Sequence, residues 1–218
     1  MSNKKSVYIV RHGETDFNRQ GIVQGSGVDS SLNELGRRQA RAFYEFYKNE
    51  PFEAVLTSRL RRTHETMQQF IESGLPWEQF EEINEMNWGL HEGKPANKAM
   101  QDEYKIVKTA WGRGEYGARL GGGESAAELQ VRLHRFITHL RERPEQHLLI
   151  CSHGRTMCAL VTLLQELPLK EMNRFTHHNT GVWKTQYNGV LFTFELENDT
   201  RHLEMAQDSA LQVIKEKW

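Results

Sequence analysis

Two apolar segments constrain the fold most, because each runs directly into polar or charged residues beside a glycine. Val-Tyr-Ile-Val at 7–10 leads into Arg-His-Gly-Glu at 11–14, and the segment 147–151 leads into Ser-His-Gly at 152–154. Short apolar runs of this kind are typical of buried strands in parallel sheets. Ligands bind at the carboxyl ends of such strands. We therefore expect a functional site where these two segments end.

The rest of the chain alternates extended segments with helices in which apolar residues recur every three or four positions. Strands are predicted over residues 5–11, 52–57, 147–151, 181–187, 190–196 and 201–206, with a short extended segment over 80–83. Helices are predicted over about 33–50, 58–71, 96–111, 125–143 and 154–164, and a helix or a tail over the last ten residues. Residues 16–31 are predicted to form a loop. This alternation predicts an α/β protein, a three-layer α/β/α sandwich with a mostly parallel central sheet and an antiparallel edge.

Length and composition fit one domain over residues 1–218, with a lid-like insertion at about 86–122. The net charge of −1 gives no reason to expect nucleic acid or a membrane as partner. Two cysteines form no disulfide framework, which is consistent with a reducing, cytoplasmic location. The apolar run after residues 1–5 is too short for a signal peptide, and no stretch has transmembrane length.

Residues with reactive side chains follow three of the predicted strands. Arg11 and His12 follow the first strand, Arg62 comes shortly after the second, and His153 follows the strand at 147–151. Parallel neighbours would bring these ends to one rim, where Glu85, at the end of the short extended segment, adds a carboxylate. Guanidinium groups match phosphate oxygens in pairs. The pattern therefore indicates a site for a phosphoryl group.

The same residues suggest how such a group would react. A neutral imidazole can attack phosphorus near pH 7, and a carboxylic acid can protonate the departing alkoxide. We predict His12 as the nucleophile, Arg11 as the residue that holds the anion beside it, and Glu85 as the acid. Glu82 and Glu92 lie close to Glu85 in the sequence and stay open as alternatives.

Five short motifs occur in an order that resembles a known family. They are Arg-His-Gly-Glu at 11–14, Ser-x-Leu-x-Arg-x-x-x-Thr at 58–66, Glu-x-x-x-Gly-x-x-Glu-Gly at 85–93, Gly-Gly-Glu-Ser at 122–125 and Ser-His-Gly at 152–154. Together they resemble the histidine phosphatase superfamily, also called the phosphoglycerate mutase-like family. The resemblance covers the chain from the first strand to about residue 180.

The resemblance implies a role for each residue that matches a motif. His12 would become phosphohistidine. Arg11, Arg62 and His153 would hold its phosphoryl group, and Glu85 would act first as acid and later as base. The predicted substrate-binding residues are Asn18, Gln24, Gly25, Gly154 and Asn179.

The resemblance implies a histidine acid phosphatase-type phosphomonoesterase acting on a small phosphorylated metabolite. The alternative is a cofactor-dependent phosphoglycerate mutase-type phosphotransferase. True mutases of the family carry paired arginines in a longer insertion after the acid, and no Arg-Arg pair occurs here between Gly93 and Gly121. A non-catalytic relative would lack a catalytic residue, and none is missing. We expect no cofactor and no metal, since no second histidine follows His91-Glu92 at zincin spacing. Family members occur as monomers and as oligomers, so a homo-oligomer stays open.

Arg155 departs from the family pattern, in which the residue after Ser-His-Gly is often small or apolar. A cation at a helix N-terminus is also disfavoured by the helix dipole. One hypothesis is that Arg155 pairs with Glu124 or reaches the substrate. The basic residues between Gly93 and Gly121 favour either a second anionic group on the substrate or a solvated helix face.

Overall fold

The computed structural model describes residues 4–206. Within this part of the chain, no helix has both the length and the apolar character needed to cross a bilayer. The prediction for the last ten residues lies outside the described residues, as does part of the basic segment at 1–5.

Six strands form one mixed sheet in the order β3-β2-β4-β1-β5-β6. Their bounds are β1 Lys5–Arg11, β2 Ala54–Thr57, β3 Trp77–Gln79, β4 His147–Ser152, β5 Val182–Tyr187 and β6 Phe192–Asp199. The first four strands in this order are parallel, whereas β5 and β6 add an antiparallel edge. This confirms the predicted mostly parallel sheet.

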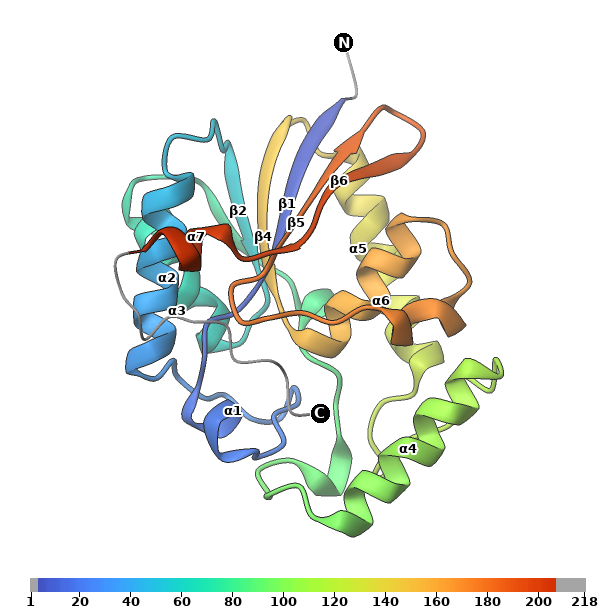
Figure 1. Ribbon diagram of the computed structural model, residues 1–218. Coiled ribbons are helices and arrows are strands. Elements are labelled where there is room, and N and C mark those ends of the chain that lie inside the picture. The colour runs from blue at the N-terminus through green and yellow to red at the C-terminus, as the bar shows by residue number, and fades with distance from the viewer. Residues whose placement is uncertain (1–3, 207–218) are drawn as a thin grey trace.

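Helices cover both faces of this sheet (Figure 1). Their bounds are α1 Asp16–Gln20, α2 Glu34–Tyr47, α3 Arg61–Glu72, α4 Lys98–Gly112, α5 Ala126–Glu142, α6 Gly154–Leu164 and α7 Arg201–Met205, with 3-10 turns at Glu81–Ile83, Gly89–His91 and Leu169–Arg174. Alternate residues of β1 show why there are three layers. Val7 and Ile9 pack in the cluster with α5 and α6, whereas Tyr8 and Val10 pack in the cluster with α2 and α3.

The strand register places two predicted site residues side by side. Parallel pairing of β1 with β4 aligns Arg11 with Ser152, so the next residues, His12 and His153, leave the sheet together. The His12 amide donates to the Ser152 carbonyl at 3.0 Å, which continues the ladder by one residue. The β2 strand pairs on the other side of β4 and delivers the start of α3 to the same edge.

Four local predictions were wrong, and for two of them, α7 and α1, the structure shows the packing or the side-chain cap that outweighed the sequence pattern. Residues 201–206 form helix α7 instead of a strand, because His202 and Leu203 are buried, with His202 against Phe43 of α2. The predicted loop at 16–31 contains the short helix α1, which Thr15 caps. The extended segment at 80–83 is a 3-10 turn after β3. The helix expected from Ser58 begins at Arg61.

The irregular segment at 86–122 carries α4, which lies at one end of the molecule (Figure 1). Val107 and Trp111 on one side of α4 are buried in the same apolar cluster as β1 and β4. A hydrogen bond from the Trp111 indole to the Ala118 carbonyl, at 3.0 Å, fixes the chain that returns to α5. The role of this segment as a lid stays a prediction.

Candidate active site

His12 and His153 lie together at the carboxyl ends of β1 and β4. Their ring centroids are 5.1 Å apart, and both side chains are buried. Gly13 lies close to Gly36 of helix α2, because a Cβ on Gly13 would lie 2.7 Å from the Gly36 carbonyl oxygen. The first turn after β1 can therefore pack directly against helix α2.

The hydrogen bonding of His12 selects one tautomer of its ring. Nδ1 lies 2.8 Å from the Gly13 carbonyl oxygen, which can only accept, so Nδ1 carries the proton. The lone pair is then on Nε2. Burial, together with the nearby charges of Arg62 and Arg11, lowers the pKa of His12 well below its usual value. At neutral pH, His12 is an uncharged imidazole with a nucleophilic Nε2.

Arg62 is fully buried and holds three separate parts of the site together. Its Nε donates to Nδ1 of His153 at 3.1 Å, and its Nη1 and Nη2 donate to the carbonyl oxygens of Val28 at 2.7 Å and Gly25 at 3.4 Å. Burial lowers the pKa of Arg62 to about 10, so the guanidinium still carries its charge at pH 7. A fixed cation therefore lies directly behind the two imidazoles.

His153 is engaged on both ring nitrogens. Because Arg62 donates to Nδ1, the proton of the neutral ring is on Nε2, which lies 2.8 Å from Oγ of Ser58. Burial and the charge of Arg62 lower the pKa of His153 well below its usual value. His153 therefore supports the site from behind His12 in this arrangement.

Asn179 and Arg11 tie the end of β1 to the segment before β5. Nδ2 of Asn179 donates to the His12 carbonyl at 2.9 Å and lies 3.5 Å from Oδ1 of Asn18. Nη1 of Arg11 donates to the His177 carbonyl at 2.7 Å. Thr15, which caps α1, donates to Oε1 of Gln24 at 3.0 Å. These contacts fix the backbone around His12 before any substrate arrives.

The Glu85 carboxylate caps the N-terminus of α6. Its Oε1 accepts from the amides of Met86 at 2.8 Å and Thr156 at 3.0 Å. The Thr156 hydroxyl lies 3.0 Å from the same oxygen, but its one proton has a shorter contact, 2.7 Å, to the Asn84 carbonyl. Within residues 4–206, its Oε2 accepts only from the amide of Arg155, at 3.1 Å. Because Oε1 already accepts from two backbone amides and Oε2 from one, Oε2 has the greater free capacity to hold and exchange a proton.

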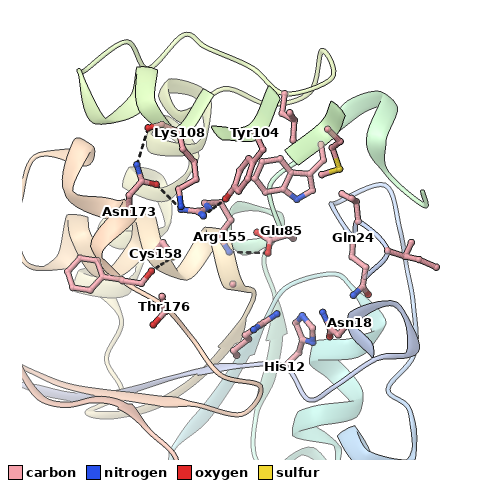
Figure 2. A pocket seen from close by; sticks show the side chains of 18 residues that line it. His12, Asn18, Gln24, Glu85, Tyr104, Lys108, Arg155, Cys158, Asn173 and Thr176 are labelled. Carbon is pink, nitrogen blue, oxygen red and sulfur yellow. Dashed lines mark hydrogen bonds between the residues drawn. The ribbon is translucent and has the colours of Figure 1, made fainter. Parts of the chain in front are cut away.

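A cavity of about 180 Å³ lies over His12, with Glu85 on its wall (Figure 2). Of the predicted site residues, the structure brings six to this cavity and leaves four behind or beside it. Those that line it are Arg11, His12, Asn18, Gln24, Glu85 and Gly154; Gly25, Arg62, His153 and Asn179 do not.

The two alternative acids lie elsewhere. The amide of Trp88 donates to Oε1 of Glu92 at 2.8 Å, and a Cβ on Gly25 would meet that same oxygen. Glu92 therefore packs against the loop that contains Gly25 and Gly27 (the glycine loop). Glu82 lies 3.9 Å from Arg135 on the outer surface of α5. Neither lines the cavity over His12.

Sequence reasoning anticipated only part of the upper wall of the cavity, namely Trp88, Arg155 and the basic residues that include Lys108. Its side chains come from the residue before the 3-10 turn Gly89–His91, from α4 and from the segment around the last 3-10 turn, and they include Trp88, Met100, Tyr104, Lys108, Asn173, Phe175 and Thr176. No motif marked Tyr104 or Asn173, and the only signal was the basic, aromatic composition of residues 86–122. Among residues 4–206, no three histidine, cysteine or acidic side chains are grouped so as to hold a metal ion.

The structure contradicts one of the two hypotheses for Arg155, and the other, that it reaches the substrate, stays a prediction. Glu124 pairs with Arg132 instead, at 2.6 Å, so the predicted pairing with Glu124 was wrong. The Arg155 guanidinium lines the cavity, where Nη1 donates to Oδ1 of Asn173 at 3.1 Å and Nη2 donates to the Tyr104 hydroxyl.

Comparison with known proteins gives consistent results. A model of the histidine phosphatase superfamily (branch 1) matches residues 7–200. A Yersinia pestis protein named "Probable phosphoglycerate mutase GpmB" is 31% identical over 213 residues, which cover 94% of this chain and 98% of that protein. Alpha-ribazole phosphatase from Shigella flexneri superposes with a TM-score of 0.78 at 27% identity, over 89% of this chain and 96% of that one. Mycobacterial glucosyl-3-phosphoglycerate phosphatase shares the fold, with a TM-score of 0.78 at 24% identity over 90% of this chain and all (100%) of that one.

Proposed function

This chain belongs to branch 1 of the histidine phosphatase superfamily, and from that premise we propose that it is a phosphomonoester phosphatase acting through a phosphohistidine on His12. One observation carries the proposal. The neutral imidazole of His12 has its Nδ1 fixed by Gly13 and lies under a cavity whose wall holds the Glu85 carboxyl group.

In the first step, Nε2 of His12 attacks phosphorus and the bond from phosphorus to the leaving oxygen breaks. The proton on Oε2 of Glu85 moves to that oxygen, so the product leaves as a neutral alcohol. In the second step, water attacks the phosphohistidine and the Glu85 carboxylate takes its proton. Inorganic phosphate leaves, and both residues return to their starting states.

Charge around His12 favours this transfer. Phosphoryl transfer spreads negative charge over the three equatorial oxygens, and fixed cations stabilise it. Arg11 lines the cavity and Arg62 lies behind it, while Gly154 opens helix α6 with its amide end toward the same space. Arg62 also holds His153 in place behind His12.

The cavity favours a small phosphorylated metabolite as substrate. One water needs on the order of 10–15 Å³ in such a cavity. The volume of about 180 Å³ therefore matches a ligand of roughly a dozen heavy atoms. A nucleic acid or a folded phosphoprotein would have to present its phosphate to this space on a narrow projection.

Turnover of p-nitrophenyl phosphate by purified protein tests the proposal. His12→Ala should abolish it, whereas His134→Ala, on the exposed surface of α5, should leave it unchanged. Quenching during turnover of a ³²P-labelled substrate should trap an acid-labile label on His12. An active His12→Ala enzyme would refute the mechanism.

The relative named as a mutase makes a second measurement necessary. A mutase would pass the same phosphoryl group to another hydroxyl instead of to water. With 3-phosphoglycerate we expect inorganic phosphate as product. Conversion to 2-phosphoglycerate without phosphate release would show phosphotransfer instead of hydrolysis.

A further inference from the structure

Arg155 is a cation in the cavity wall whose side-chain hydrogen-bond partners among the described residues are neutral, while the Glu85 carboxyl group supplies a charge interaction without an ion-pair contact. Its guanidinium donates to the amide oxygen of Asn173 and to the hydroxyl of Tyr104. Among the described residues, no carboxylate forms an ion pair with it. Each of these hydrogen bonds uses one of the two N–H groups on its nitrogen, so donors remain for a ligand.

Arg155 is held in place from two directions. Nδ2 of Asn173 donates to the Lys108 carbonyl at 3.2 Å, which ties the Arg155 partner to helix α4. The Arg155 guanidinium also lies 5.6 Å from the Tyr104 ring centroid. Preorganised donors of this kind bind an anion with little loss of side-chain freedom.

A second cation lies against the same ring. Nζ of Lys108 is 5.6 Å from the Tyr104 ring centroid, and Lys108 also lines the cavity. Two positive charges on one wall of a small cavity would both attract an oxyanion bound in that part of the cavity. The upper end of the cavity therefore has two cationic side chains of its own, in addition to those around His12.

The order of the residues along the cavity places this end beside the leaving group. Figure 2 shows Glu85 between His12 and Arg155, and the Arg155 amide donates to Oε2 of Glu85. The leaving oxygen lies opposite His12 in an in-line displacement, next to that acid. The remainder of the alcohol then extends toward Arg155.

We propose that Arg155, with Lys108, binds a second oxyanion on the alcohol portion of the substrate. This rests on the proposed phosphatase function and narrows it to small organic phosphates that carry a carboxylate or a second phosphate. Arg155 is the specificity-determining residue, held by Tyr104 and Asn173.

Three probes with one carbon skeleton test this inference. Glycerol 1-phosphate ends in a hydroxymethyl group, 3-phosphoglycerate in a carboxylate, and glycerol 1,3-bisphosphate in a second phosphate. We expect kcat/KM for at least one doubly anionic probe to exceed that for glycerol 1-phosphate by about 10- to 100-fold, the usual effect of charge-assisted hydrogen bonds. The preferred probe identifies which oxyanion binds.

Variants of Arg155 then test the residue itself. Arg155→Met should reduce this preference at least tenfold, and Arg155→Lys should retain part of it. Lys98→Met provides a matched control, because it removes one charge from α4 at a side chain that is 85% exposed. Its preference should equal that of the wild type. An undiminished preference in Arg155→Met, or no preference in the wild type, would overturn the inference.

Binding separates this inference from the proposed reaction. Calorimetry with His12→Ala measures the affinity for the same three probes without turnover. The same preference, lost in the His12→Ala, Arg155→Met double variant, would support the oxyanion site even if the wild type hydrolysed nothing. Hydrolysis by a wild type that binds all three probes equally would support the phosphatase and refute the oxyanion site.

Discussion

Replacing Glu85 with glutamine should harm catalysis to a degree that depends on the leaving group. The substitution keeps the shape of the side chain but removes the proton that Oε2 would deliver. Oε1 can still accept from Met86 and Thr156, whereas the new amide nitrogen would face the Arg155 amide, donor against donor. We expect that mismatch to lower the free energy of unfolding by about 1–3 kcal/mol.

The expected loss of rate follows from the role of the proton. A general acid contributes about 10²- to 10⁴-fold, which is about 3–5 kcal/mol of transition-state stabilisation. An alkoxide from glycerol 1-phosphate is strongly basic and needs the whole contribution. p-Nitrophenolate is a stable anion near neutral pH, so its departure needs little protonation. Glu85→Gln should therefore lose at least 100-fold on the alkyl substrate and about tenfold or less on the aryl one.

The assay compares kcat/KM for the two substrates in the wild type, Glu85→Gln and Glu92→Gln. The last variant is a matched control, because Glu92 accepts from the Trp88 amide and lies beside the glycine loop, outside the cavity. Its rates on the two substrates should change by equal factors. Equal losses on both substrates in Glu85→Gln would refute the acid role, because damage to folding or binding does not distinguish leaving groups.

Three further predictions concern stability and charge. Gly36→Ala should lower the free energy of unfolding in urea by several kcal/mol, because its Cβ would lie 2.0 Å from the Glu14 carbonyl oxygen. Gly112→Ala is the control: nothing lies within 4 Å of its Cβ position, so it should raise the free energy of unfolding by up to about 1 kcal/mol. Burial lowers the pKa of His202 from 6.5 to about 4. Between these two pH values the unfolded chain binds a proton that the folded protein does not, so the free energy of unfolding falls as the pH drops. His202→Gln should reduce the stability lost between pH 7 and pH 5 by about 2 kcal/mol; an equal loss in both proteins would contradict this. Arg62→Lys should lower kcat at least tenfold in steady-state assays, because an ammonium group cannot replace the planar fork that joins His153, Val28 and Gly25; unchanged kcat would show that charge alone suffices.

The sheet, and the site residues that follow its strands, could be predicted because both depend on local sequence patterns. An apolar run at 7–10 predicts a buried strand, and strand-helix alternation predicts parallel neighbours. The register that places His12 beside His153 then follows from the pairing of β1 with β4. Helices α5 and α6 also begin close to where their N-terminal signals stand in the sequence.

The mistaken and missing elements depend on contacts between distant residues. The local sequence of α7 predicts a strand. The contact of His202 with Phe43, which is distant in the sequence, could not be predicted from that local pattern. Likewise, the cavity wall joins Tyr104 of α4 to Asn173 through the side chain of Arg155. No spacing rule connects these three positions, because their proximity results from how α4 docks on the core.

The sequence alone marks Arg155 as an electrostatically unfavourable residue, and the structure shows what surrounds it. A cation in the first turn of α6 opposes the helix dipole, and it does so beside two further cationic residues of the phosphoryl site, Arg11 and Arg62. Local physics therefore marks the residue as costly without saying what offsets the cost. In the structure its side-chain hydrogen-bond partners are neutral, and Glu85 supplies a nearby charge interaction without an ion-pair contact. A bound anionic substrate would place a further negative charge beside the Arg155 guanidinium. The enzyme would therefore bind that substrate more tightly than an uncharged analogue.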